Sequence, residues 1–172
     1  TSYVSGKKVF DEFVSKLPAT LLLTVMSILA TVVISIPLGV LAAVCQDKWV
    51  DLLLRFFSFI GNAMPNFFVA MLLMQLLSIK LNLLPVIASG VNIRSALMPM
   101  LTLAIYPTSY LTRLTRASIL EVMNQDYLRT ERSKGMSEFV VVFIHALKNS
   151  LIPVITYLGP LTASILTGGF VA

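Results

Sequence analysis

The side chains of this chain that could do chemistry form no recognisable catalytic set. The single histidine, His145, has no cysteine or acid near it on the same segment that would complete a metal site. The single cysteine, Cys45, cannot form an internal disulfide and reads as a small apolar residue near a helix end. The sequence contains neither a GxxxxGK[ST] phosphate-binding loop nor a serine in a nucleophile elbow. It therefore predicts a protein that is not an enzyme and holds no metal or cofactor of its own.

The acidic residues are informative through their positions. Proton- or sodium-coupled transporters place ionisable groups within the membrane. Here all 8 acids lie outside the long uncharged runs of the chain. They are Asp11, Glu12, Asp47, Asp51, Glu121, Asp126, Glu131 and Glu138. If the chain transports a solute, we expect the energy to come from another subunit.

Four uncharged runs predict four membrane spans, at about 17–45, 56–79, 95–112 and 149–172. A bilayer core about 30 Å thick needs roughly 20 apolar residues at a rise of about 1.5 Å each. The run 95–112 is short, but Arg94 and Arg113 flank it and can extend towards the interfaces. The composition agrees, because 57% of the residues are hydrophobic and 12% are charged, against about 25% charged in soluble domains. Residues 1–16 are expected to form an interfacial lead-in helix, and both ends look cut from a longer protein.

The basic residues predict the orientation. Segments 46–55 and 113–148 hold 8 Lys and Arg, whereas the opposite side holds 5. The positive-inside rule therefore places these two segments in the cytoplasm. Basic residues at the ends of spans mark topology, so the net charge of +5 does not indicate nucleic acid as a partner.

Small residues recur every fourth position in two spans. The first span carries Ser27, Thr31, Ser35, Gly39 and Ala43, and the last carries Gly159, Ala163 and Thr167. Such ridges allow helix backbones to approach closely in lipid, so both are predicted to pack against other helices.

Neutral polar residues in the second span suggest two alternatives. Asn62 and Asn66 are one turn apart, and Gln75 follows on the same span. An unpaired amide is costly in hydrocarbon, so these side chains should face other helices or water. They either make interhelical hydrogen bonds or line a translocation path.

The segment 113–148 is charged and reads as two short helices around a glycine. Asn124 is the expected N-cap of the first, with Asp126 in its first turn. Arg132 and Lys134 fall in its last turn, and Gly135 takes the position just after its end. Ser137 is then expected to cap the second helix, with Glu138 in its first turn. A helix of about ten residues is marginal alone in water, so it needs a surface supplied by its own bundle or by a docked protein.

This segment also carries a family resemblance. Residues 126–156, DYLRTERSKGMSEFVVVFIHALKNSLIPVIT, resemble the cytoplasmic EAA loop of membrane permeases in bacterial ABC importers, in the oligopeptide, dipeptide and nickel branch. LPATLLL, IPLGVLAA and MPNFF are further similar stretches in matching order. Glu131 and Ser133 depart from the pattern, which has alanine at both positions. The resemblance covers nearly the whole chain and implies an all-α, polytopic membrane helix bundle. Residues 17–172 would form its transmembrane domain, without the first and last helices of the branch.

The resemblance also implies a mechanism. Tyr127 to Gly135 would be a coupling helix that seats in a groove of a cytoplasmic ATPase. The coupling residues would be Asp126, Tyr127, Arg129, Thr130, Glu131, Lys134 and Gly135. The partners would be a second homologous permease, two ATPase subunits that bind ATP and Mg, an extracytoplasmic substrate-binding protein and membrane lipid. The location would be the bacterial cytoplasmic (inner) membrane, crossed several times.

The cargo implied is a dipeptide or oligopeptide, or nickel in free or chelated form. The short loop at 80–94 and the MPNFF stretch favour nickel-type members slightly. Two other functions remain open: a channel or secondary transporter driven by a gradient, and a membrane scaffold without flux.

Overall fold

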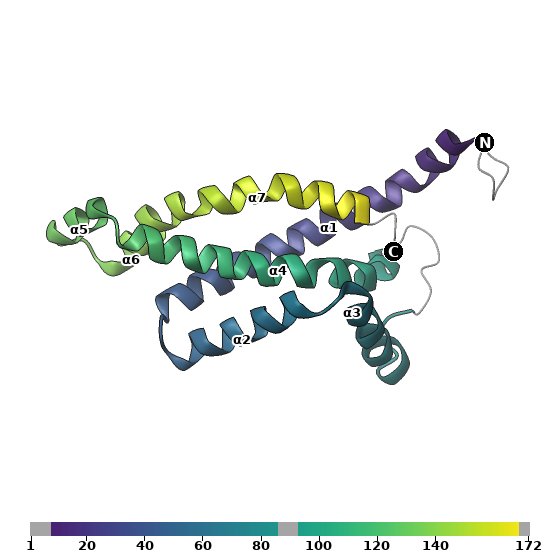
Figure 1. Cartoon of the computed structure of the whole chain (residues 1–172), viewed down its shortest axis with the longest axis horizontal. Helices are drawn as coiled ribbons and strands as arrows, with labels where there is room; N and C mark the ends of the chain where they lie inside the picture. Colours follow the sequence, from purple (N-terminus) through teal and green to yellow (C-terminus); the bar gives the residue numbers. More distant parts are fainter. Residues whose placement is uncertain (1–7, 86–92, 169–172) are drawn as a thin grey trace.

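The computed structural model describes residues 8–85 and 93–168, and every regular element in these ranges is a helix (Figure 1). The elements, in chain order, are α1 (Val9–Val44), α2 (Trp49–Ala63), α3 (Asn66–Leu73), the π-helix η1 (Met74–Lys80), α4 (Ile93–Met123), α5 (Asp126–Ser133), α6 (Glu138–Val140), the π-helix η2 (Val141–Ala146) and α7 (Leu147–Gly168). The predicted all-α fold is confirmed.

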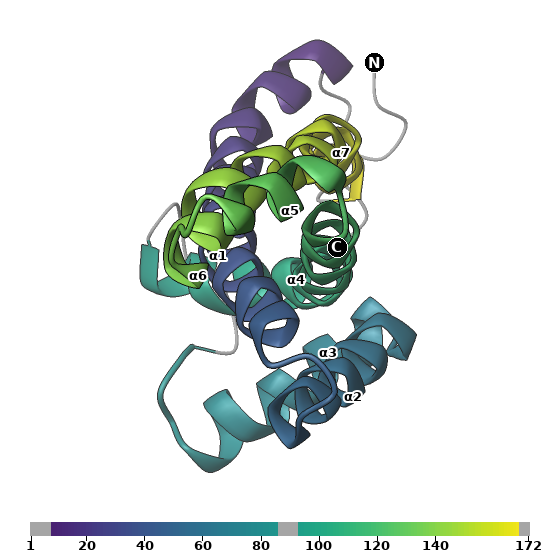
Figure 2. The same ribbon diagram turned by 90° about the vertical axis from the view of Figure 1, so that its left-hand side faces the viewer.

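Helix α4 lies at the centre of the bundle. It contacts α1, α2, α3 and α7, and its longest contact is with α1, which runs in the same direction (Figure 1). Helices α2 and α7 run in the opposite direction on other sides of α4 (Figure 2). Leu111 of α4 forms a buried core with Val154, Leu161 and Ile165 of α7.

The small-residue ridge of the first span packs α1 against α4, as predicted. Ser27, Thr31 and Ser35 are fully buried. The Thr31 hydroxyl meets that of Thr108 at 3.5 Å. At Gly39 an added Cβ would lie 2.5 Å from Cβ of Thr115, so only glycine permits this approach.

The second predicted ridge does not pack within the described part of this chain. Gly159, Ala163 and Thr167 are all exposed on α7. A Cβ at Gly159 would meet nothing within 4 Å. The three small residues do share one face of α7. Their spacing alone does not show whether a helix that packs on this face belongs to the same chain.

Helix α2 has its polar side inward and its apolar side outward. Asp51, Ser58 and Gly61 are buried against the bundle, whereas Trp49 and Phe57 are 72% and 63% exposed. A helix in water has the reverse arrangement. The outward apolar face is therefore suited to lipid.

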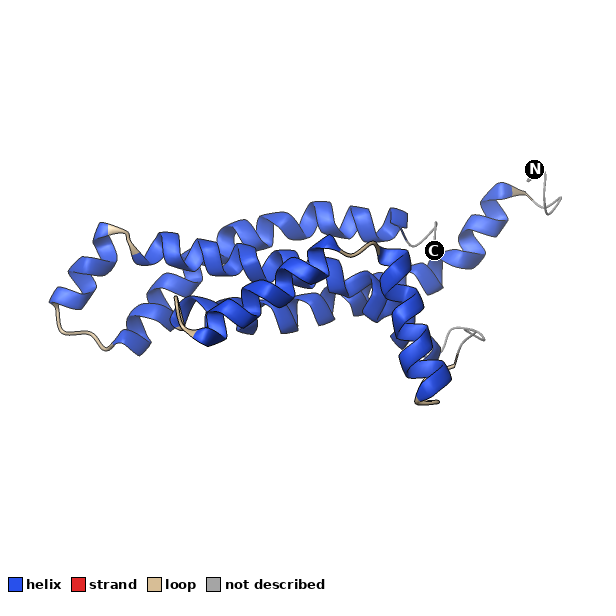
Figure 3. Ribbon diagram, turned by 60° about the horizontal axis from the view of Figure 1, so that its bottom comes forward, coloured by secondary structure: helices blue, strands red, loops and turns tan. Residues whose placement is uncertain are grey.

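The helices differ from the expected spans in one important respect. The run 56–79 was expected as one span, but the chain bends by 106° between α2 and the unit Asn66–Lys80 (Figure 3). Pro65 has no N–H to donate and forces Met64 into extended backbone with φ −80° and ψ 129°. The prediction placed a span here without specifying a straight helix, and the structure shows that its helix is broken at Pro65.

The other helices extend beyond the expected boundaries. The lead-in piece is continuous with α1 from Val9, while residues 1–7 and 169–172 lie outside the described ranges. By length and hydropathy, Phe10–Val44 and Glu138–Thr167 are long and apolar enough to cross a membrane, and the bent pair adds a third span if it counts as one. Helix α4 is longer than predicted, from Ile93 to Met123, but it is not apolar enough to count among these candidate spans.

Candidate coupling site

The two basic segments meet at one end of the bundle. The turn after α1 and the α5–α6 segment lie at the same end, opposite the N-terminus of α1 and the bend before α3 (Figures 1 and 2). We call this the basic end. The arrangement places both segments on one side of the bundle, as the charge count requires.

Helix α5 begins one residue later than the predicted cap would place it. Gln125, in extended backbone, precedes α5. The Asn124 side chain instead donates to the carbonyl of Leu120 at 2.9 Å, because it still belongs to the final turn of α4. The prediction that Asn124 caps α5 was wrong. Ser137 does precede α6, although its side chain makes no capping hydrogen bond.

Gly135 ends the helix as predicted. Its φ is +81°, and its N–H donates to the carbonyl of Arg132 at 2.9 Å. An added Cβ would meet nothing within 4 Å. The need for glycine therefore comes from the left-handed backbone alone and not from crowding.

Leu128 fixes α5 to its own bundle. It is fully buried in a cluster with Val141 and Ala146, against Val122 and Met123. The sequence leaves open whether the surface that holds this helix belongs to the bundle or to a partner, and the structure shows that the bundle supplies one. Leu128 was not among the predicted site residues, because a single leucine in a polar octapeptide gives little helical periodicity.

Polar contacts reinforce this attachment. Arg132 Nε donates to Glu138 Oε1 at 2.7 Å, and Arg132 Nη1 donates to the Met123 carbonyl at 3.4 Å. Asn149 Nδ2 of α7 donates to the Tyr127 hydroxyl at 2.9 Å. Through these contacts α5 is connected to the end of α4, to α6 and to the start of α7. A displacement of α5 would therefore act on both long helices.

Most of the remaining predicted coupling residues lie on the outer side of α5 or directly after its end. The side chains of Asp126, Arg129 and Lys134 are 98%, 72% and 60% exposed, and Thr130 is exposed as well. Glu131 is less accessible, at 20%, and pairs with Lys134 at 3.2 Å. The helix thus has an apolar inner side held by the bundle and a charged outer side that another protein can contact.

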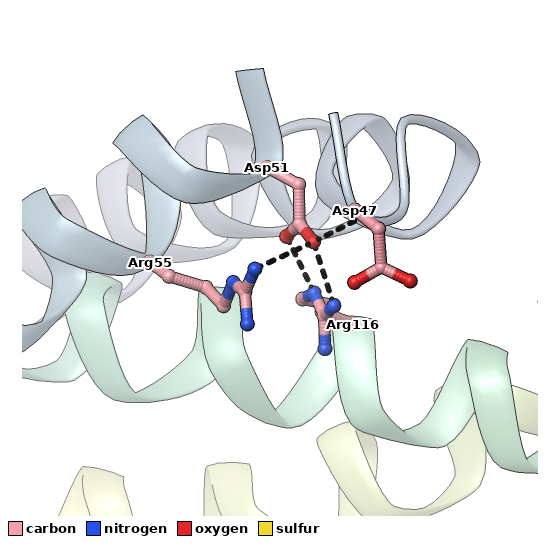
Figure 4. A network of polar contacts seen from close by, with 4 residues as sticks. All are labelled: Asp47, Asp51, Arg55 and Arg116. Atoms are coloured by element: carbon pink, nitrogen blue, oxygen red, sulfur yellow. Dashed lines mark hydrogen bonds and ion pairs between the residues drawn. The ribbon is translucent and has the colours of Figure 1, made fainter. Parts of the chain in front are cut away.

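An ion cluster that sequence analysis missed lies at the same end (Figure 4). Arg116 of α4 donates to both oxygens of Asp51 of α2, from Nε at 2.6 Å and Nη2 at 2.7 Å. Arg55 lies 3.4 Å from Asp51 Oδ2, which also accepts the Asp47 N–H at 3.1 Å. Asp51 is fully buried. The sequence did not predict the pair, because 46–55 was predicted only as a basic segment between two spans, although Asp51 and Ser58 share the spacing of a helix face.

The three predicted path residues are not brought together on one helix. Asn62 is half-buried near the end of α2, and its Oδ1 is enclosed without a hydrogen-bond partner. Asn66 and Gln75 lie beyond the bend and are exposed. The prediction that Asn62 and Asn66 are one turn apart fails because Pro65 breaks the helix between them.

Fold and site together define a class of protein: a polytopic membrane helix bundle with a short charged helix fixed across one end. The comparison of family models gives the particular family. Residues 35–172 match the model described as binding-protein-dependent transport system inner membrane component, and the chain belongs to that family. The predicted family and the predicted inner-membrane location are thereby confirmed.

Several curated bacterial proteins are similar to this chain. The dipeptide transport system permease protein DppB of Bacillus subtilis is 40% identical over 154 residues, covering 90% of this chain and 50% of the relative. The oligopeptide transport system permease protein AppB of the same species is 39% identical, covering 96% and 55%. The glutathione transport system permease protein GsiC of Escherichia coli is 38% identical, covering 98% and 54%. The chain spans about half the length of these relatives.

Proposed function

We propose that this chain forms part of a permease subunit that moves dipeptides or oligopeptides through the inner membrane, in an importer driven by separate ATPase subunits. The observation that carries the proposal is the two-sided construction of α5. Leu128 is buried in the chain's own core, while Asp126, Arg129 and Lys134 face outward. Because α5 is anchored to the bundle through its inner side, a docked protein that displaces α5 would also displace α4 and α7.

The energy for transport would come from separate ATPase subunits. The sequence has no P-loop to hold ATP. ATP and Mg would bind two cytoplasmic ATPase subunits, which would contact this chain through Tyr127 to Gly135. A second, homologous permease would complete the membrane unit, and an extracytoplasmic binding protein would deliver the cargo.

Peptides are preferred over nickel as the cargo. The relatives described above are named for dipeptide, oligopeptide and glutathione transport. All three cargoes are short chains with amide bonds and carboxylates, so the path should offer hydrogen-bond donors rather than metal ligands.

Reconstitution of the full-length permease tests the proposal. The permease pair would be placed in liposomes with its binding protein, either with or without the ATPase subunits. Uptake of a labelled dipeptide is expected only with the ATPase subunits and ATP inside. Uptake driven by an ion gradient in liposomes without the ATPase would contradict the proposal and support a channel or secondary transporter.

A further inference from the structure

One side of α4 is only partly covered by the described helices and is polar. Helices α1, α2 and α7 pack around its other sides (Figure 2). This side follows Thr102, Tyr106, Tyr110 and Arg113, which recur at the three- and four-residue spacing of one helix face. Tyr106 is exposed, whereas the other three are half-buried, and Tyr110 also packs against the core shared with α7. We call these four residues the α4 stripe. Tyr106 is 41% exposed, although it lies near the middle of the helix.

The polarity of this stripe contrasts with the outer faces of the neighbouring helices. The outward side chains of α1 and α2 are apolar, for example Val33 at 67% and Phe57 at 63% exposed. Tyrosine in membrane proteins concentrates at the interfaces and not at mid-span. In the described ranges, no hydrogen bond joins the hydroxyls of Tyr106 and Tyr110 to another residue, and Arg113 Nε is enclosed without a partner. Lipid hydrocarbon would leave these donors unsatisfied, at a cost of several kcal/mol each.

The stripe is also unsuited to close packing of a second helix. Close helix contacts in membranes use small residues, and this chain uses them where α1 meets α4 at Gly39. The stripe instead presents two phenol rings and a guanidinium. Tyr157 of α7 extends the same surface, since its ring centroid lies 4.5 Å from that of Tyr110 at an interplanar angle of 33°. Ionisable and polar side chains within a span face either the interior of a bundle or a water-filled space, and the bulk of these rings favours the water-filled space here.

We propose that the α4 stripe, with Tyr157, lines the path through which a short peptide crosses the membrane. This inference rests on the proposed function. The phenol hydroxyls can donate to peptide carbonyl groups, and the aromatic rings can contact apolar side chains without selecting among them. Arg113 makes no ion pair with an acid of the described residues, and its enclosed Nε lacks a hydrogen-bond acceptor, so a peptide carboxylate would supply the missing partner. From Tyr106 to Arg113 the stripe rises about 10 Å towards the basic end, at about 1.5 Å per residue.

The reactivity of introduced cysteines tests whether water reaches the stripe. Tyr106→Cys and Thr102→Cys would be made in the full-length permease, with Cys45→Ser as background. The matched control is Val33→Cys, whose side chain faces outward on α1, two residues beyond Thr31 and therefore about 3 Å nearer the basic end than the contact of Thr31 with Thr108. A charged, water-soluble thiol reagent is expected to label positions 102 and 106 in the assembled transporter and to leave position 33 unlabelled.

Transport by an arginine variant tests the role of charge. Arg113→Gln is expected to lower the uptake rate of a dipeptide about tenfold or more, the usual effect of losing a charged hydrogen bond. ATP hydrolysis is measured in the same liposomes, so that a loss of uptake can be distinguished from a transporter that has failed to assemble. Lys48→Gln, an exposed lysine in the turn before α2, controls for the loss of one positive charge at the basic end and should transport normally.

The outcomes separate the two proposals. If the unsubstituted assembly shows no ATP-driven peptide uptake, the proposed function fails. If that assembly transports peptides but positions 102 and 106 resist the reagent as position 33 does, the stripe is covered by another helix and this inference is overturned. Normal peptide uptake by Arg113→Gln would overturn the role given to its guanidinium.

Discussion

Asp51 on α2 and Arg116 on α4 form a two-pronged ion pair, at 2.6 and 2.7 Å, that joins the two helices at the basic end. Asp51 is fully buried, and Arg116 is 17% exposed. Arg116 stands less than two turns before the end of α4 at Met123, where the chain turns into α5. The pair therefore holds α2 to the part of α4 that would receive any movement of α5.

Removing the acid should destabilise the bundle strongly. Asp51→Asn leaves Arg116 buried without its counter-charge, which typically costs about 3 to 5 kcal/mol. Denaturant titration in detergent micelles, followed by circular dichroism, would measure the loss. Asp126→Asn is the control, because its carboxylate is 98% exposed and should matter by less than about 0.5 kcal/mol. Equal stability of the two variants would show that the pair is not a structural contact.

The attachment of α5 should depend on Leu128. Leu128→Ala removes a fully buried side chain and is expected to cost about 2 to 5 kcal/mol. Because the core cluster holds α5 in place, trypsin should cleave faster after Arg129, Arg132 and Lys134. Met136→Ala, at a position 40% exposed, serves as the control and should be cleaved at the original rate. Unchanged cleavage of Leu128→Ala would mean that α5 is held elsewhere.

Coupling should depend on the backbone of Gly135. At φ +81° a β-branched residue costs at least about 1 to 2 kcal/mol, so Gly135→Val should shift the end of α5 and uncouple ATP hydrolysis from uptake. Gly135→Asn keeps access to the left-handed region and should remain coupled. The measured quantity is peptide taken up per ATP hydrolysed in liposomes. Normal coupling in the valine variant would count against the mechanism.

Two glycines should respond differently to the same substitution. Gly39→Ala places a methyl group 2.5 Å from Cβ of Thr115 and should destabilise the α1–α4 contact by about 1 to 3 kcal/mol. Gly159→Ala has open space around it within this chain and should be neutral or slightly stabilising through helix propensity. Denaturation of the purified permease compares them. A loss at position 159 as large as that at position 39 would refute the assigned packing.

The sequence was sufficient where one local rule determines the structure. The spacing of Ser27 to Ala43 predicted a packing face, and Gly135 predicted a helix end, because each depends on residues close in the chain. The buried pair of Asp51 and Arg116 depends on residues 65 apart that only the tertiary fold brings together. The size of the bend at Pro65 was also hard to predict, because a proline within a span can kink the helix, end it or be accommodated with little change.

The stripe on α4 shows a second limit. Tyr106, Tyr110 and Arg113 fall on one helical face in the sequence, but the sequence does not reveal which face of a central helix its neighbours leave open. The exposure of Tyr106 in the fold supplies that information. It makes α4 a better candidate for the lining of the path than the amides Asn62, Asn66 and Gln75. The amides stay a prediction, since exposure alone does not place them on the path.

The most direct test of the central claim is cysteine cross-linking between α5 and the ATPase in membranes that contain the assembled transporter. Cysteines would be introduced at Arg129 and Lys134, whose side chains face outward, and at Phe57, whose side chain faces outward on α2, as control. The account predicts disulfides from positions 129 and 134 to cysteines in the ATPase groove, with yields that change when ATP is added, and none from position 57. Absence of cross-links from both α5 positions in a transporter that retains ATP-driven uptake would contradict it.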